Sequence, residues 1–355
     1  MLTESDGRLP FIRVGGTSYD VGQQLGRHAR AVVEQYLLTT HAWASVMACR
    51  DDPRIAAAKA LTEARFPRYW QELQGLAAGL ALPFDDVFAW NSRGDVWAMA
   101  PDGCTTVLLP AAQPEQPRPV LAHNEDGHAG LRRGCALAQV SPEDGKAFTA
   151  FVYPASLPGH TFAVTETGLV QTVNNIRSQG AGDGLPRMIL ARAVLDCDSI
   201  DAAVNLIAGA PRAGAFHLSL AQAGDHRLVS VEFTHAGCSA VEVAQPGCHA
   251  NHLIHPASRG EAQIVTDSSR ARQERGDEII DTAGGALDPL TLLWDRTRPA
   301  LPIYRKQPDD PDNENTLATA VFEIGADKVA WRVYDRCGQP AQFAAAEGLA
   351  PLTIS

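Results

Sequence analysis

The chain carries a cysteine directly after a glycine, Gly103-Cys104, where a helical pattern gives way to strand patterns. If the bond between these two residues were cut, Cys104 would become an N-terminal residue with a thiol and a free α-amine. A deprotonated thiol is a strong nucleophile, and it needs a nearby base. An α-amine ordinarily has a pKa of about 7.7–8.0, close to working pH, and can act as that base. The pair therefore predicts a nucleophile that carries its own base.

The chain has seven cysteines in total, an odd number without a CxxC pair. Scattered cysteines of this kind are typical of reduced thiols, most of them small core residues. Cys104 is distinguished from the others by its neighbours and by its place at the junction.

The segment before Cys104 has the pattern of a helical leader. Residues 10–15 are typical of a strand, and apolar residues then recur at spacings of three and four from Tyr19 to Ala48 and from Pro53 to Leu80. A third helix is predicted to open at Pro83, since proline is favoured at the first helical position. We expect these helices to form a layer that packs on a sheet.

The segment after Cys104 has mostly strand patterns, separated by Pro and Gly turn signals. Helices, then strands, then helices, then strands indicate an α+β fold rather than alternating βαβ units. We expect one domain over residues 1–355, because no fixed repeat occurs and residues 306–315 are typical of a loop. The strands are predicted at 105–109, 120–124, 135–140, 147–153, 161–165, 168–173, 216–221, 228–234, 240–243, 316–324 and 328–334, and the helices at 186–195, 200–208 and 259–282.

The bulk composition excludes several classes of protein. A net charge of −11 argues against nucleic acid or an anionic membrane as the main partner. The chain has no apolar run of 18 residues and no signal-like N-terminus, so we expect a cytoplasmic protein without a membrane span. No GxSxG, GxGxxG or GxxxxGK[ST] motif occurs, so neither an α/β-hydrolase nor a nucleotide-binding protein is supported.

Four motifs in order carry a resemblance to a known family. These motifs are the run from Gly16 to Gly26 (GTSYDVGQQLG), the run from Asp102 to Thr106 (DGCTT), Asn124-Glu125-Asp126 and the run from Cys248 to His252 (CHANH). Together they resemble the acyl-coenzyme A:6-aminopenicillanic acid acyltransferase (isopenicillin N acyltransferase) family, peptidase C45-like enzymes among the self-processing N-terminal-nucleophile (Ntn) hydrolases. The resemblance implies a four-layer αββα sandwich, in which helices cover two antiparallel sheets.

The resemblance also implies roles for individual residues. Cys104 would attack the Gly103 carbonyl, and water would hydrolyse the resulting thioester, so that fragments 1–103 and 104–355 stay associated as two subunits of an activated zymogen. In turnover, Cys104 would attack an amide or thioester substrate while its own amine moves the proton. Asn251 would donate to the oxyanion, and Asp126 would hold the amine or assist processing.

The expected partner is a small molecule, an N-acylated amine or amino acid, with acyl-coenzyme A as an alternative acyl donor. Thr105 and Asn124 lie within the family-like motifs, and we expect them to contact the substrate. Asn175 follows a strand pattern and is expected there too, although a turn is the competing interpretation. No cofactor and no metal ion are expected.

Two features depart from the family's pattern. An arginine expected just before the final strand pair is replaced by Asn313-Glu314-Asn315, and the C-terminal Leu352-Thr353-Ile354-Ser355 is not a peroxisomal Ser-Lys-Leu address. A β-lactam substrate is therefore not implied. Relatives that cleave small amides such as β-alanyl amines fit the resemblance equally well.

Three other interpretations remain open. An uncleaved protein of the same fold could serve as a binding or scaffold protein. A papain-type thiol hydrolase would need a histidine from another segment, for which the candidates are His123, His128, His160 and His217. A metal site is disfavoured, because the i, i+3, i+6 spacing does not place three ligands on one face of a strand. The ligands of that metal site would be Cys248, His249, His252 and His255.

Overall fold

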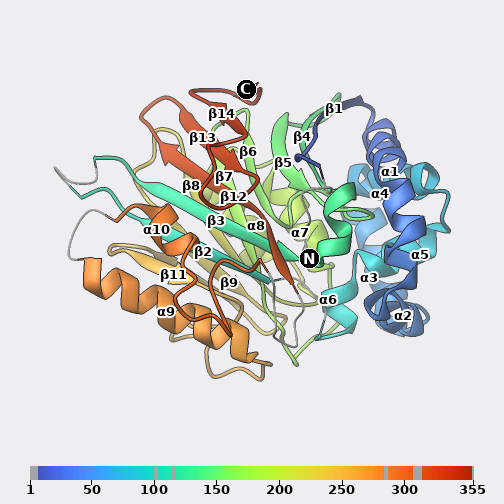
Figure 1. The fold of residues 1–355 in the computed structure, drawn as a ribbon. Helices are drawn as coiled ribbons and strands as arrows, with labels where there is room; N and C mark the ends of the chain where they lie inside the picture. The colour runs from blue at the N-terminus through green and yellow to red at the C-terminus, as the bar shows by residue number, and fades with distance from the viewer. Residues whose placement is uncertain (1–6, 100–102, 113–116, 284–286, 307–313, 354–355) are drawn as a thin grey trace.

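The chain folds into four layers in the order helix, sheet, sheet, helix (Figure 1). The computed structural model describes residues 7–99, 103–112, 117–283, 287–306 and 314–353. Figure 1 shows the leader helices gathered on one side of the two sheets, with α9 and α10 on the other. The α+β class and the αββα architecture predicted from the sequence are confirmed.

The leader forms one strand and a group of helices. The two long helical patterns are each divided, and the second one breaks at Pro67, which begins a new helix at its first position. The elements are β1 (Phe11–Gly16), α1 (Ser18–Gln35), η2 (Leu37–Thr39), α2 (His41–Ala48), α3 (Pro53–Arg65), α4 (Pro67–Leu80), α5 (Phe84–Trp90) and α6 (Arg93–Val96).

Helices α1 and α4 pack unusually closely. A capping box begins α1, in which the Thr17 side chain accepts from the N–H of Asp20 and the Asp20 carboxylate accepts from the N–H of Thr17. The contact between the helices is lined by glycines. A Cβ at Gly22 would lie 1.9 Å from the main-chain oxygen of Glu72, so only glycine allows the two backbones to approach this far.

After the leader, strands predominate. They are β2 (Gly103–Leu109), β3 (Val120–Gly127), β4 (Ala136–Pro142), β5 (Phe148–Val152), β6 (Phe162–Thr165), β7 (Leu169–Asn175), β8 (Phe216–Gln222), β9 (Val229–Phe233), β10 (Cys238–Glu242), β11 (Gly247–His249), β12 (Asn315–Ile324), β13 (Val329–Tyr334), β14 (Phe343–Ala345) and β15 (Leu352–Thr353). The helices among them are η3 (Ala129–Gly134), α7 (Arg187–Val194), α8 (Ile200–Gly209), α9 (Asp267–Ala283) and α10 (Pro289–Leu293).

The strands form two open sheets. Within the described residues, sheet 1 has the order β1-β4-β5-β6-β7-β8-β9-β10 and sheet 2 the order β11-β2-β3-β12-β13-β14-β15. The pairs are antiparallel except at one edge, where β1 runs parallel to β4. That edge departs from the expected pair of purely antiparallel sheets, because the leader helices form a long crossover between β1 and the rest of sheet 1.

Three apolar layers hold the sandwich together. One lies between sheet 1 and the helices α1, α4, α7 and α8, with Leu73 and Ile189 among its members. A second lies between the two sheets and includes Phe162 and Phe322. A third joins sheet 2 to α9 and α10 and includes Leu292. Strand β2 is therefore covered on both faces, and its Cys104 is buried.

The sequence patterns missed the shortest elements. Strands β11, β14 and β15 have two or three residues each, too few for any periodicity to show. The helix predicted over 259–282 begins only at Asp267. Asp102 and most of the predicted 306–315 loop lie outside the described residues.

Candidate active site

Strands β2 and β3 bring the nucleophile candidate next to two titratable side chains. In their antiparallel register Cys104 pairs with Glu125 and Thr106 pairs with His123. Because side chains alternate along a strand, these four residues share one face of sheet 2. That face is turned toward sheet 1, since Thr106 Oγ1 donates to Asn174 Oδ1 of β7 at 2.7 Å.

The main chain of Cys104 is held by Asn251. The N–H of Cys104 donates to Asn251 Oδ1 at 3.0 Å. The other end of the same amide, Nδ2, donates to the main-chain oxygen of Asn175 at 3.0 Å, and the N–H of Asn251 donates to Ser269 Oγ at 2.9 Å. The fold thus brings together Cys104, Asn175 and Asn251 from three separate segments.

A buried arginine completes this arrangement, and the sequence analysis did not identify it. Arg272 of α9 donates from Nη1 to the main-chain oxygen of Cys104 and, at 3.0 Å, to Thr105 Oγ1. Its Nη2 donates to Asn251 Oδ1 at 2.7 Å. The positive charge of Arg272 therefore lies beside the nitrogen of Cys104. No periodic signal separates this arginine from the exposed Arg270 on the same helix.

The other predicted residues of β3 lie on the opposite face of the sheet from the Cys104 side chain. Asn124 donates to the main-chain oxygen of Leu293 in α10 at 2.6 Å and accepts from Thr319 Oγ1 at 2.7 Å. Asp126 accepts from Thr316 Oγ1 at 2.6 Å. The structure does not bring Asn124 to the thiol, and Asp126 pairs with Gly103, the residue before Cys104.

An ion pair packs directly against Gly103. Arg305 and Glu314 are both fully buried, and Nη1 of the arginine donates to Oε2 of the glutamate at 2.7 Å. A Cβ at position 103 would lie 2.2 Å from that oxygen, so the pair leaves room only for glycine. Glu314 lies where the family pattern has an arginine, and it forms an ion pair with Arg305. Arg305 was not among the residues predicted from the sequence. Asn313 lies outside the described residues.

Cys104, His123 and Glu125 form a compact buried cluster. The Cys104 sulfur, a ring nitrogen of His123 and a carboxylate oxygen of Glu125 all lie within 4.8 Å of one another. Nε2 of His123 lies 3.2 Å from Glu125 Oε2, and burial lowers the pKa of His123 to about 3. Thiolate, imidazole and carboxylate are also the donors that zinc accepts, so these atoms could ligate a divalent cation. Their closeness depends on strand register, which no motif in the sequence specifies.

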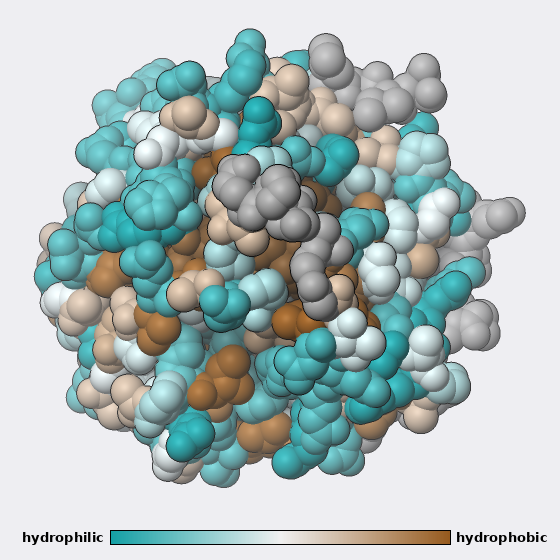
Figure 2. Space-filling model, turned by 90° about the vertical axis from the view of Figure 1, so that its left-hand side faces the viewer, coloured by the Kyte–Doolittle hydropathy of each residue, from teal (hydrophilic) through white to brown (hydrophobic). Residues whose placement is uncertain are grey.

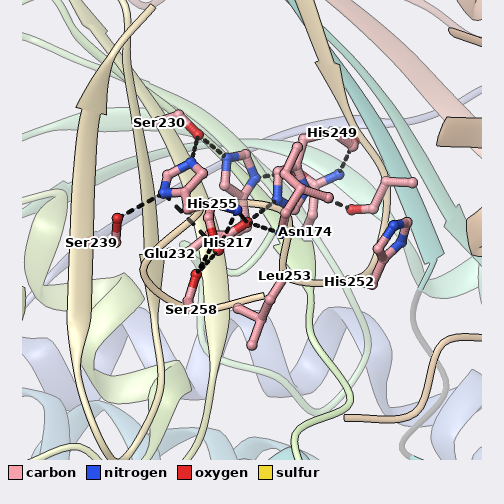
Figure 3. A network of polar contacts seen from close by, with 12 residues as sticks. Asn174, His217, Ser230, Glu232, Ser239, His249, His252, Leu253, His255 and Ser258 are labelled. Carbon is pink, nitrogen blue, oxygen red and sulfur yellow. Dashed lines mark hydrogen bonds and ion pairs between the residues drawn. The ribbon is translucent and has the colours of Figure 1, made fainter. Parts of the chain in front are cut away.

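A second buried polar network supports the loop that carries Asn251 (Figure 3). Glu232 of β9 accepts from the N–H groups of Ile254 at 2.7 Å and His255 at 3.2 Å, from Ser258 Oγ, and from His249 Nε2 at 2.9 Å. Burial favours the neutral acid, but these hydrogen bonds outweigh it and hold the pKa of Glu232 at about 2. The carboxylate therefore fixes this loop on sheet 1.

The four residues considered as a metal set have different partners in this network. Glu232 accepts from the His249 ring, and the side chains of the other three residues contact serine or glutamine residues. His252 Nδ1 contacts Ser269 Oγ, His255 contacts Ser230 and Ser239, and the Cys248 sulfur lies near Gln273.

Of the four histidines considered for a papain-type site, the structure places His123 beside Cys104. His217 stacks on the His249 ring with centroids 3.4 Å apart and reaches Asn174 and Ser230. His128 and His160 face Tyr36 and the main chain of Leu157.

A surface cavity of about 560 Å³ lies at the far end of β3 from these residues. Its lining includes Val120, Leu290, Val321 and Arg332, and none of the candidate residues. Figure 2 shows the face of the molecule on the α10 side, where hydrophobic side chains gather near the centre of a mostly hydrophilic surface. This cavity is separate from the chemistry around Cys104.

Within the described part of the chain, no helix combines the length and the apolar character needed to cross a membrane.

Comparisons with known proteins agree with the resemblance. The family model for acyl-coenzyme A:6-aminopenicillanic acid acyl-transferase matches residues 112–337. The beta-alanyl-dopamine/carcinine hydrolase of Drosophila melanogaster is 22% identical, over 90% of this chain and 91% of its own. The 40 kDa form of the acyl-coenzyme A:6-aminopenicillanic-acid-acyltransferase of Emericella nidulans is 24% identical, over 78% of this chain and 76% of its own. Among solved structures, a variant of conjugated bile acid hydrolase from Clostridium perfringens aligns with a TM-score of 0.44 and 10% identity, over 71% of this chain and 96% of its own.

Proposed function

Because the chain belongs to the acyl-coenzyme A:6-aminopenicillanic acid acyl-transferase family, we propose that it is a self-processing thiol enzyme whose nucleophile is Cys104. It acts on the acyl–nitrogen bond of a small N-acylated amine or amino acid. The observation that carries the proposal is the hydrogen bond from the main-chain N–H of Cys104, the residue directly after Gly103, to Asn251 Oδ1. The two relatives described above are enzymes, one named a hydrolase and one an acyltransferase, and we assign this chain to the same two reaction types.

Self-processing converts the intact chain into the active enzyme. The Cys104 thiol loses its proton and attacks the carbonyl carbon of Gly103. The Gly103–Cys104 C–N bond breaks, the nitrogen takes up a proton, and a thioester joins the two residues. Water then hydrolyses the thioester, which leaves a carboxylate on Gly103 and frees the thiol and the α-amine of Cys104.

Turnover uses the groups that processing has released. The α-amine of Cys104 takes the thiol proton, the sulfur attacks the acyl carbon of the substrate, and the departing amine leaves with that proton. Asn251 holds the catalytic nitrogen through Oδ1, and the second hydrogen of its Nδ2 can serve the oxyanion. Arg272 disfavours a second positive charge on the Cys104 nitrogen, so it favours the neutral amine that can act as a base.

The leader remains part of the enzyme after cleavage. Strand β1 of the leader pairs with β4 along its whole length. Glu72 of α4 and Arg192 of α7 form a fully buried ion pair, with Nε and Oε2 at 3.1 Å. Asn91 donates to the main-chain oxygen of Ala155 at 2.9 Å. These contacts cross between fragments 1–103 and 104–355 and support a stable two-chain product.

A trapping experiment tests the proposal. The purified protein is incubated with a panel of N-acyl amines that includes β-alanyl-dopamine, quenched with acid and analysed by peptide mass. We expect an acyl thioester on Cys104 and no adduct with Cys104→Ala. Adding a second amine distinguishes transfer from hydrolysis, because transfer forms a new amide. Turnover by Cys104→Ala would contradict the assignment.

An uncleaved thiol hydrolase is the second candidate. It is favoured by the position of His123, a ring nitrogen of which lies within 4.8 Å of the Cys104 sulfur. This enzyme would turn over substrate while the chain stays whole, and His123→Gln would abolish its activity.

A further inference from the structure

Arg177 is a buried arginine that follows β7 in the chain. The strand ends at Asn175, and Arg177 is only 3% exposed. Its main-chain oxygen accepts from the N–H of Ile264 at 2.8 Å, and the next residue, Ser178, pairs with Gln263 in an antiparallel bridge. The backbone at Arg177 is therefore held in place by a neighbouring segment.

The guanidinium group of Arg177 lacks the partners that a buried charge requires. Its Nε and Nη1 atoms are shielded from solvent, and neither is hydrogen-bonded to any residue that the structure describes. Arginine keeps its positive charge throughout the physiological pH range, so burial does not neutralise it. A buried charge without hydrogen bonds is strongly unfavourable. The stability of the fold therefore does not explain why an arginine occupies this position.

Other buried arginines of the site differ from Arg177 in this respect. Arg272 donates to Asn251 Oδ1 at 2.7 Å, and Arg187 donates to Asn175 Oδ1 at 2.6 Å. Each of these two guanidinium groups uses acceptors of the protein to hold a neighbouring segment. Arg177 has no such positioning role, because Nε and Nη1 bind no acceptor in the described part of the chain.

Arg177 lies next to the segments that hold Asn251. Two residues before it, the main-chain oxygen of Asn175 accepts from Asn251 Nδ2 at 3.0 Å. Two residues of chain span at most about 7 Å. Gln263, which pairs with the residue after Arg177, accepts from the N–H of Leu253 in the Asn251 loop at 2.8 Å. Arg177 is therefore within the length of a small molecule from the proposed oxyanion site.

The same segment leads from the site to the surface. Asn175 is buried, whereas Gln179 and Gly180 are exposed. Arg177 lies between them, along the direction in which the chain leaves the catalytic groups for solvent. A substrate that extends from the reacting bond toward this surface would bring its remaining polar groups to Arg177.

An arginine in this position is suited to a carboxylate. The planar guanidinium binds a carboxylate through two parallel N–H···O bonds, and such charge-assisted pairs are among the strongest hydrogen bonds in proteins. We propose that Arg177 binds a carboxylate group of the substrate, so that the enzyme prefers N-acyl compounds with a carboxylate close to the scissile amide. This inference rests on the proposed function and narrows its substrate class. The carboxylate belongs to the amino acid that leaves or to the acyl group, and the test separates these two sources.

Matched substrate pairs test this proposal on the processed enzyme. Each N-acyl amine of the trapping panel is compared with a counterpart that carries a carboxylate. β-Alanyl-histidine against β-alanyl-histamine places the group on the amine, and N-succinyl-histamine against N-butyryl-histamine places it on the acyl side. We expect kcat/KM to be on the order of 100-fold higher for the carboxylated member of the pair that fits Arg177.

Variants of Arg177 assign the preference to this side chain. Arg177→Met should lose the 100-fold preference, mainly through a higher KM for the carboxylated substrate, while kcat/KM for the uncharged counterpart stays unchanged. Its melting temperature in a Cys104→Ala background should be no lower than that of the parent, because the change removes a buried charge and no known hydrogen bond. Arg259→Met, which replaces an exposed arginine of the neighbouring loop, is the control and should keep the preference.

Failure of the inference and failure of the proposed function give different results. If Cys104 is acylated but neither type of pair shows a preference, or if Arg177→Met keeps it, the inference is overturned and the proposed function stands. If no panel member acylates Cys104, both are overturned. Should intact mass show that Arg177→Met does not process, Arg177→Lys replaces it. Lysine keeps the charge without the planar fork, so the preference should fall about 10-fold, and an unchanged preference would again contradict the role of Arg177.

Discussion

Cys104 and Asn251 are 147 positions apart in the chain, yet the main-chain N–H of the first donates to the side-chain oxygen of the second at 3.0 Å. The hydrogen bond joins β2 to the loop after β11. Glu232 anchors that loop, and Arg272 contacts both partners of the bond. The position of the Cys104 nitrogen is therefore set by several segments of the sandwich together.

Replacing Arg272 with methionine is expected to destabilise the fold by about 2–4 kcal/mol. The change removes charge-assisted hydrogen bonds to Cys104, Thr105 and Asn251 and leaves buried acceptors without this donor. Urea unfolding in a Cys104→Ala background, where the chain stays whole, measures the effect. Arg270→Met on the exposed face of the same helix is the control and should cost less than about 0.5 kcal/mol. Equal stability of the two variants would contradict the role given to Arg272.

Adding one methyl group at the cleavage site is expected to be costly. A Cβ at Gly103 would lie 2.2 Å from Glu314 Oε2 and 3.1 Å from Arg305 Nη1. Gly103→Ala must therefore displace a buried ion pair, at a cost of about 1–3 kcal/mol, and should slow processing. Gly209→Ala, where a Cβ would meet nothing within 4 Å, is the matched control. Normal stability and normal processing of Gly103→Ala would show that the ion pair does not constrain this position.

Stability should fall as the pH drops below 6.5. Burial lowers the pKa of His123 to about 3 and that of His217 well below its usual value. Both rings are neutral in the fold, whereas the unfolded chain binds protons below about 6.5, so acid favours unfolding. Each of the two should contribute about 1.4 kcal/mol per pH unit below 6.5.

Urea unfolding of the Cys104→Ala chain at pH 7.5, 6.5 and 5.5 checks this pH dependence, with the exposed His41→Gln as a control that keeps the same slope. Constant stability from pH 6.5 to 5.5 would contradict the neutral assignment of the two buried rings. Glu232 affects stability at lower pH. Because the fold lowers the pKa of Glu232 to about 2, its carboxylate stabilises the fold fully above about pH 4.5, and this contribution is lost as the pH falls toward 2.

The leader should stay bound to the body after cleavage. We expect the processed enzyme to elute as one species in native size exclusion and as two fragments in denaturant. Glu72→Ala removes one of the two carboxylates that pair with the buried Arg192, the other being Asp196 at 3.5 Å. The lost buried hydrogen bond costs about 1–3 kcal/mol, so the leader should dissociate at a lower urea concentration. Glu34→Ala, which removes an exposed pair with Arg30, should shift dissociation little. Loss of the leader from the wild-type enzyme in native buffer would contradict this prediction.

Sequence patterns and the family resemblance together were sufficient for the layers, and they nominated two site candidates that lie close together in the structure. Apolar periodicity located the leader helices and most strands, and the motifs identified Cys104 and Asn251, which the structure brings into contact. The motif around Asn124 does not indicate which way that side chain points: it lies on the opposite face of β3 from Glu125, the residue that pairs with Cys104. Only the pairing register shows which residue of Asn124-Glu125-Asp126 lies beside the thiol.

The buried arginines could not be found from local patterns. Arg272 lies on a helix rich in charged residues, and Arg305 precedes a segment that resembles a solvated loop. Their importance arises from contacts with residues 104 and 314, across 168 and nine positions of the chain. Such contacts depend on tertiary packing, which a single sequence does not encode in any short spacing.

The most direct test of the central claim is the intact mass of the purified protein under denaturing conditions, beside Cys104→Ala. The account predicts two wild-type fragments that correspond to residues 1–103 and 104–355, while Cys104→Ala remains a single chain. A wild-type chain that stays whole and still turns over amide substrates would contradict self-processing and identify an uncleaved thiol enzyme.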